Sequence, residues 1–489
     1  MTIMMLTNEW ASEILSAAHS YRSTMTEIQR FGSDKLPHMY TIAAKIKTLY
    51  QEAHPFLTNS PDTHLPLDNL DKIAVHFGIQ SLYVENLAAV QMNRATYMGK
   101  DSTGEQISLI QILDKIKQGN QLHRIEYTKL FSDAMQKINR PFEKTLKALQ
   151  THAQELQYAS LYDLIQAHSW TDYDQLAKQA EAFLNSTKDQ IKEGLNAFFS
   201  EFNIEAKMDF DPELVFPNLM YLFLQQEHMF GNFGVESLWH RVNEICQLAS
   251  LDFLNSPRLT VDIEDRPEKF GTGFLGFRGE PDEISFVLVG RRGNLETLLH
   301  EAGHAIHFIN IEQSLPPLSQ NFGNMVITEA IAILFGSLAQ EPSFLNQIAG
   351  IEFDIPTQIR YRQTMCLYQK AYQAVRFLNL RDIYKTTNPL TKELFEELRV
   401  GCERRFENAL GFYRPMHDCF ELGDQIMLPA TYFEAYTLAE YWKSVMIGME
   451  STQLDKWWEN PAALTWLRET IIQPGLNLDL TQFPYFPKV

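Results

Sequence analysis

The sequence predicts a mainly α-helical protein with one small β-sheet. Apolar residues recur every three or four positions over most of the 489 residues, as in "SLIQILDKIKQ", and this is the period of an amphipathic helix. Only residues 257–294 change to short β-branched segments separated by glycine-rich turns, a pattern typical of strands. Predicted helix therefore far exceeds predicted strand.

The first half of the chain, residues 1–250, is expected to form a helical scaffold and the first domain. "YDQLAKQAEAFLNSTKDQIKEGLNAFFSEF" carries the same helical period. "NRPF" at 139–142 predicts a helix with proline in its first turn. Ser102 and Glu105 have the spacing of a capping box, so a helix is predicted to start there.

The second half, residues 251–489, is expected to form the second domain. "RLTVDI" and "ISFVLVG" predict two strands, and the segment between them, "EDRPEKFGTGFLGFRGEPDE", is rich in turn residues. This arrangement predicts a hairpin or a few-stranded sheet. After residue 294 the helical pattern resumes nearly to the end, and the last residues, "NLDLTQFPYFPKV", are expected to be irregular.

Composition excludes several classes of partner. Sixty-one acidic and 42 basic residues give a net charge of -19, which repels nucleic acid and anionic membranes. The 4 cysteines form no CxxC pair, so a reducing compartment is expected. No signal peptide and no long apolar run are recognised. We therefore expect a cytoplasmic protein with no nucleic-acid or membrane partner.

The segment "LETLLHEAGHAIHFIN", residues 295–310, carries the strongest chemical signal. His300 and His304 are four positions apart, so on a helix both imidazoles project from one face, while Glu301 lies about 100° round the axis. This HExxH arrangement is typical of zinc enzymes in which the glutamate acts as general base. The alternative is a helix that carries these histidines by chance.

The third zinc ligand can be narrowed down by position. Between residues 305 and 340 the only acidic residues are Glu312 and Glu329. Glu312 would lie about 12 Å beyond His304 on a continuous helix, too far to share an ion. Glu329 lies in the helical run "NMVITEAIAILFGSLA" after a proline-marked loop, so a second helix can present it to His300 and His304. We predict one Zn²⁺ per chain, with Glu296 accepting the spare N–H of a ligating histidine.

At these residues the sequence resembles the thimet oligopeptidase and oligoendopeptidase F family of HExxH zinc metallopeptidases, which are gluzincins, and more distantly angiotensin-converting enzyme. "ETLLHEAGHAIH" is similar to the family's zinc-binding block, and the spacing of 25 residues from His304 to Glu329 is similar to that of its third ligand. "DIEDRPEKFGTGF" and "YFEAYTLAEYW" are similar to two further motifs. The resemblance implies a large helical bundle in which two helical halves flank a deep cleft.

The resemblance also implies roles for residues outside the zinc cage, which consists of the expected ligands His300, His304 and Glu329. Tyr436 would donate its hydroxyl to the developing oxyanion. Gly271 and Gly273 would fall at an edge strand near residues 271–289 that pairs with the substrate backbone, with Tyr432 also contacting substrate. His307 is interpreted either as a substrate-side neighbour or as a packed helix residue.

Together these features predict zinc-dependent hydrolysis of peptide bonds in oligopeptides or unfolded segments, with a peptide as the substrate partner. Three alternatives stay open. An exopeptidase would need a basic pocket for a terminal carboxylate, for which Arg278, Arg291 and Arg292 are candidates. A pseudoenzyme would bind metal without catalysing hydrolysis. The presence of Glu301 argues against this alternative, because a general base has no structural role in a protein that only binds metal. A target-specific effector protease would use the same chemistry on one protein.

Overall fold

The fold was obtained as a computed structural model. It describes residues 2–31, single helical positions between 38 and 96, and residues 97–139, 141–201, 214–221, 234–264, 273–278, 284–290, 295–315, 320, 323–349, 355–388, 390–414, 427–449 and 456–483.

The chain divides into two compact units, each assembled from separate stretches of sequence. Unit 1 comprises Met1–Gly78, Phe230–Ile359 and Glu434–Val489, and unit 2 comprises Ile79–Met229 and Arg360–Phe433. The expected domains at 1–250 and 251–489 describe two sides of a cleft, and both the domains and the cleft stay predictions.

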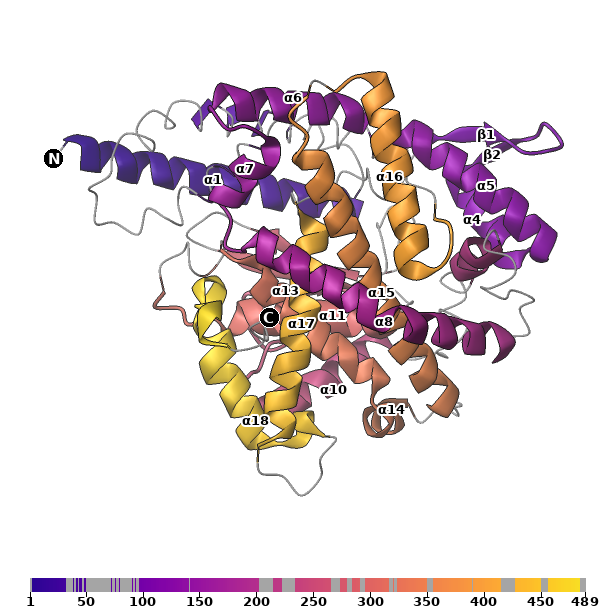
Figure 1. Cartoon of the computed structure of the whole chain (residues 1–489). Coiled ribbons are helices and arrows are strands. Elements are labelled where there is room, and N and C mark those ends of the chain that lie inside the picture. Colours follow the sequence, from indigo (N-terminus) through magenta and orange to yellow (C-terminus); the bar gives the residue numbers. More distant parts are fainter. Residues whose placement is uncertain are drawn as a thin grey trace. The chain divides into compact units, whose positions relative to one another are not determined.

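Helices dominate both units, which confirms the mainly α fold class (Figure 1). The helices of unit 1 are α1 (Thr2–Phe31), α10 (Val235–Gln247), α11 (Leu295–Asn310), α13 (Met325–Gly336), α14 (Pro342–Ala349), most of α17 (Leu428–Ile447) and α18 (Pro461–Trp466), with short segments Ser337–Gln340, Trp457–Glu459, Leu467–Ile472, Gly475–Asn477 and Leu480–Gln482. Unit 2 contains the described helices α4 (Leu109–Gln118), α5 (Gln121–Ile138), α6 (Pro141–Glu155), α7 (Leu161–Ala167), α8 (Tyr173–Glu201), most of α15 (Ile355–Tyr384) and α16 (Lys392–Leu410), together with helical residues at 214–221. Within the described ranges, no helix has the length and apolar character needed to span a membrane.

Unit 1 contains a three-stranded sheet with the order β3–β5–β4. The strands are β3 (Leu259–Asp262), β4 (Gly273–Arg278) and β5 (Ser285–Gly290). β3 runs parallel to β5, and β4 runs antiparallel to it, with Gly276 opposite Val287. The few-stranded sheet is therefore confirmed. β4 lies where the resemblance implied an edge strand, although the local sequence indicates turns there, because glycines lower apparent strand propensity.

The helices of unit 1 share one apolar core with the central strand. Leu298, Leu299 and Ile306 of α11 are fully buried among side chains from α10, α13, β5 and the second half of α17. Trp239 of α10 fills the space beside the sheet, and its indole N–H donates to the carbonyl of Leu298 at 3.0 Å. This core fixes the rotation of α11 and thereby decides which of its side chains face outward.

The β-hairpin at residues 98–108 of unit 2 corrects one prediction. Residues 101–105 form the turn of a hairpin between β1 (Met98–Lys100) and β2 (Gln106–Ser108), so Ser102 and Glu105 do not begin a helix. The capping box is instead made by Ser108 and Gln111, at the start of α4. Asp101 explains the difference, because its carboxylate accepts from the amide of Thr103 and stabilises the turn. The predicted start of a helix at Pro141 is confirmed.

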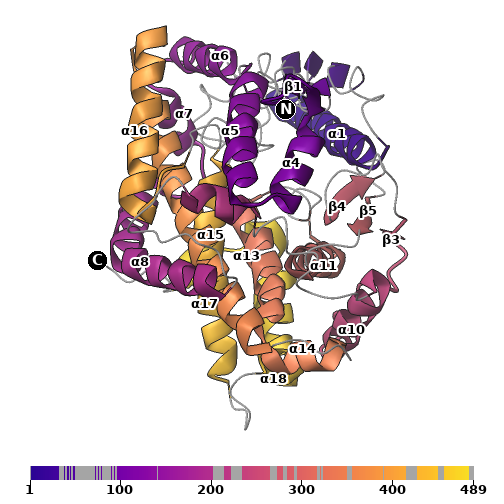
Figure 2. The same ribbon diagram turned by 90° about the vertical axis from the view of Figure 1, so that its right-hand side faces the viewer.

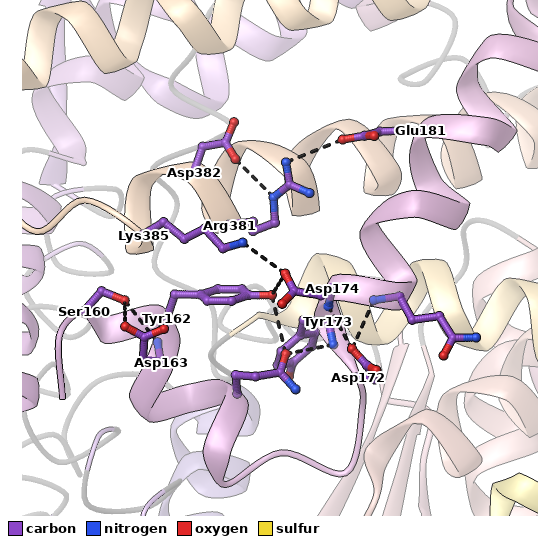
Figure 3. A network of polar contacts seen from close by, with 12 residues as sticks. Ser160, Tyr162, Asp163, Asp172, Tyr173, Asp174, Glu181, Arg381, Asp382 and Lys385 are labelled. Carbon is purple, nitrogen blue, oxygen red and sulfur yellow. Dashed lines mark hydrogen bonds and ion pairs between the residues drawn. The ribbon is translucent and has the colours of Figure 1, made fainter.

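A polar network joins three helices of unit 2 (Figure 3). The hydroxyl of Tyr162 on α7 donates to Asp174 on α8 at 2.9 Å, and Lys385, just beyond α15, contacts the same carboxylate at 3.0 Å. Arg381 lies 3.1 Å from Asp382. Exposed ion pairs of this kind contribute little to stability.

Candidate metal centre

The predicted zinc helix is α11, which spans the whole predicted segment, residues 295–310. Its apolar face is buried in the core of unit 1, so His300, Glu301 and His304 are left partly exposed on the other side. The two imidazole rings lie edge to face, with their centroids 4.8 Å apart. The four-residue spacing therefore places both rings on one stripe of the helix, as predicted.

α13 brings the third predicted ligand to this stripe. Ten of its twelve residues are buried, which is typical of a helix packed on all sides. Its N-cap is Asn324, whose side chain accepts from the amide of Val326 at 3.1 Å. It can approach α11 closely because Gly303 has no side chain: a Cβ there would lie 2.7 Å from the Cα of Ala332.

The close approach places Glu329 beside both histidines. Its Oε2 lies 3.4 Å from Nε2 of His300 and 3.7 Å from Nε2 of His304. One ligand atom from each of the three residues lies within 4.8 Å of the other two. Tetrahedral zinc holds N and O ligands at about 2.0–2.2 Å, which separates them by about 3.3–3.5 Å. The donor types thus fit a zinc ion, and the two distances from Glu329 to the histidines are close to this spacing.

The pKa values of His300, Glu301 and His304 are shifted by burial and by contacts between these charged groups. Burial lowers the pKa of His304 to about 4, so its imidazole is neutral at pH 7, the form that binds metal. Burial also tends to lower the pKa of His300, but the Glu329 carboxylate outweighs it and the pKa lies above its usual value. Burial raises the pKa of Glu301 to about 7, which is favourable for a group that must both accept and release a proton.

Glu301 is held against the sheet. Its Oε2 accepts from the backbone amide of Leu275 on β4 at 2.8 Å. Gly273 leaves the necessary room, since a Cβ there would lie 3.2 Å from Cγ of Glu301. The strand β4 thus fixes the side-chain conformation of the predicted base.

Thr328 is a contact of the cage that sequence reasoning missed. Its Oγ1 lies 2.8 Å from Nδ1 of His304, so it can hold the imidazole in the tautomer that presents Nε2 to a metal. Its position just before Glu329 was the only available signal. Glu296 was predicted to accept the spare N–H of a ligating histidine. It lies close enough to raise the pKa of His300, and its role as a hydrogen-bond acceptor stays a prediction.

The remaining predicted site residues are placed less centrally. His307 is fully buried, and neither ring nitrogen has a hydrogen-bond partner among the described residues; this favours the interpretation as a packed helix residue over contact with substrate. Gly271 lies outside the described residues. Tyr432 and Tyr436 are both half-buried on α17, and Tyr436 follows Ala435, which is buried in the same core as α11.

The fold is shared with solved peptidase structures. The chain matches an M32 carboxypeptidase from Deinococcus radiodurans R1 with a TM-score of 0.54 and 13% identity, over 97% of this chain and 93% of that one. It matches a protein from Chlamydophila abortus designated a peptidase with a TM-score of 0.55 and 12% identity, over 98% and 85% of the two chains. It matches a protein designated oligoendopeptidase F with a TM-score of 0.56 and 13% identity, over 94% and 93%.

No family model matches the sequence, and no curated protein matches it. At identities this low, the structural matches establish a common fold.

Proposed function

We propose that this protein is a zinc-dependent peptidase that hydrolyses peptide bonds in oligopeptides or unfolded segments. One observation carries the proposal: His300, His304 and Glu329 converge from two helices, with Glu301 beside them. The peptidase fold of the structural matches supports the same function. When bound, zinc supplies a Lewis acid that acidifies water and polarises a carbonyl oxygen.

The residues of the chain supply the remaining steps. Glu301 accepts a proton from the water that attacks the carbonyl carbon, and it donates this proton to the nitrogen of the leaving amine as the C–N bond breaks. Leu275 holds Glu301 through its amide during both transfers. His304 donates its Nδ1 hydrogen to Thr328, which leaves Nε2 available as a ligand. Tyr436 donates its hydroxyl to the carbonyl oxygen as negative charge develops there.

The test compares wild type and Glu301→Gln for zinc content and for cleavage of a quenched peptide library. Loss of the base is expected to lower kcat by about 10²–10⁴ and to leave zinc bound. The Glu329→Gln variant, in contrast, is expected to lose both cleavage and bound zinc. Glu312→Gln is the matched control, because Glu312 is an exposed acid just beyond α11.

Equal cleavage by wild type and Glu301→Gln would refute the proposed mechanism. A wild type that binds zinc and cleaves nothing in the library would favour the pseudoenzyme alternative. The lengths of the products distinguish endopeptidase from exopeptidase action.

A further inference from the structure

Strand β4 lies at one edge of the sheet of unit 1, with β5 on its inner side. Neighbouring residues of a strand direct their amides to opposite edges. The amides of Leu275 and Phe277 donate to side chains, not to β5, and they therefore lie on the edge that faces away from β5. A peptide that added a strand to this sheet would need the N–H and C=O groups of that edge.

Both of these amides are already occupied. Leu275 donates to Glu301 at 2.8 Å, and Phe277 donates to Oγ1 of Thr26 on α1 at 2.9 Å. The hydroxyl of Thr26 donates its own hydrogen to the carbonyl of Arg22 at 3.0 Å. This orients a lone pair of the hydroxyl at the Phe277 amide, and Thr26 itself is buried.

α1 is closely packed at this place. A Cβ at Gly276 would lie 2.2 Å from Cγ2 of Thr26 on α1, and a Cβ at Gly273 would lie 3.2 Å from Cγ of Glu301 on α11. Positions 273 and 276 direct their side chains to opposite faces of a strand, so α1 and α11 lie on opposite faces of the sheet. Figure 2 shows the sheet between these two helices. Arg30, one turn after Thr26, forms a buried ion pair with Asp262 of β3 at 2.9 Å. The helix is therefore anchored at both flanking strands.

We propose that Thr26 closes β4 beyond Leu275, so that a bound peptide pairs with this strand on only one side of the cleaved bond. The proposal rests on the proposed function, because Glu301, which marks the place of the cleaved bond, bonds to Leu275. On this edge of the described strand, the amide and carbonyl of Gly273 and the carbonyl of Leu275 are left for backbone pairing. The substrates are then peptides whose backbone is recognised on one side of the cleaved bond. On the other side α1 stays packed on β4 and bounds the site.

The first test measures binding to the Glu301→Gln variant by fluorescence anisotropy. A peptide that the wild type cleaves is synthesised with single amide-to-ester replacements. Each replacement removes one N–H donor of the peptide. We expect weakened binding, by about fivefold or more per lost hydrogen bond, only for replacements on one side of the cleaved bond. Lengthening the peptide should also improve the dissociation constant on that side only. Equal effects on both sides would overturn the proposal.

The second test locks α1 to the strand. A Cβ at Gly276 would lie 3.0 Å from the Cβ of Thr26, and a small backbone shift brings this to the 3.5–4.5 Å or so of a disulfide. The oxidised Thr26→Cys/Gly276→Cys double variant is expected to bind peptides as tightly as its reduced form. Loss of binding on oxidation, restored by reduction, would show that α1 must leave β4, contrary to the proposal. Oxidised Thr26→Cys alone is the control.

The ester series is read on the Glu301→Gln variant even if the disulfide does not form. Failure of the proposed function is recognised separately, because wild type would then cleave no peptide.

Discussion

The contact between α11 and α13 at Gly303 leads to the sharpest prediction. A Cβ at this position would lie 2.7 Å from the Cα of Ala332 and 3.0 Å from the carbonyl oxygen of Ile331. Carbon atoms in favourable contact lie about 3.5–4.0 Å apart. Gly303→Ala must therefore separate the two helices by about 1 Å, and Glu329 moves with α13.

The two consequences of this shift differ in size. Overpacking costs about 1–3 kcal/mol, and alanine regains about 1 kcal/mol of helix propensity, so the variant should fold with a modestly lowered Tm. A metal site, in contrast, tolerates ligand displacements of only about 0.2 Å. Since changes outside the ligand shell already cost about 10–100-fold in metal affinity, displacing Glu329 should lower zinc affinity by at least about a hundredfold.

The assay is competition for zinc against a chromophoric chelator, with thermal unfolding followed by circular dichroism. Gly336→Ala is the matched control on α13: its Cβ would lie 3.6 Å from the Cβ of His300, an ordinary contact, so zinc affinity should be retained. A folded Gly303→Ala protein that binds zinc as tightly as wild type would refute the reasoning that this glycine sets the cage.

Three further predictions concern the supports of unit 1. Asp262→Asn removes the carboxylate that accepts from Nε of the buried Arg30 and leaves Glu27, at 3.3 Å, as an ionic partner of the guanidinium; it should cost about 1.5–3 kcal/mol in urea unfolding, and a loss below about 0.5 kcal/mol would contradict this. Trp239→Phe removes the buried indole hydrogen bond to α11 and should cost about 1–3 kcal/mol in the same experiment, with no change expected in zinc stoichiometry. Burial lowers the pKa of His19 to about 4, so unfolding takes up a proton between about pH 6.5 and 4, and the stability present above pH 6.5 is lost as the pH falls. This group alone should lower the free energy of unfolding by about 2 kcal/mol between pH 7 and pH 5; an unchanged pH dependence in His19→Gln would disprove it.

The parts of the site that could be predicted are those governed by helical spacing. The separation of His300 from His304 and the apolar run around Glu329 are both visible in the sequence, and α11 and α13 have the expected extents. The helical class follows for the same reason, because periodicity is a local property of the chain.

The parts that could not be predicted depend on contacts between segments distant in sequence. Thr328 contacts His304 only because α13 packs on α11 with one particular rotation. Thr26 and Phe277 are separated by 251 positions in the sequence, and no local pattern relates them. Strand β4 was expected only from the resemblance, because its glycines indicate turns in the sequence, whereas in the structure they allow close packing against neighbouring elements.

These glycines connect the fold to the proposed chemistry. Three contacts that shape the site are made where a side chain is missing: Gly303 admits α13 with Glu329, Gly273 makes room for Glu301, and Gly276 admits Thr26. A side chain at any of the three positions would displace a neighbouring backbone or a functional side chain, although none of the glycines has a positive φ angle. Their value lies in close approach and not in backbone freedom. The geometry of the centre is therefore determined as much by residues that bear no functional group as by the three that would hold the ion.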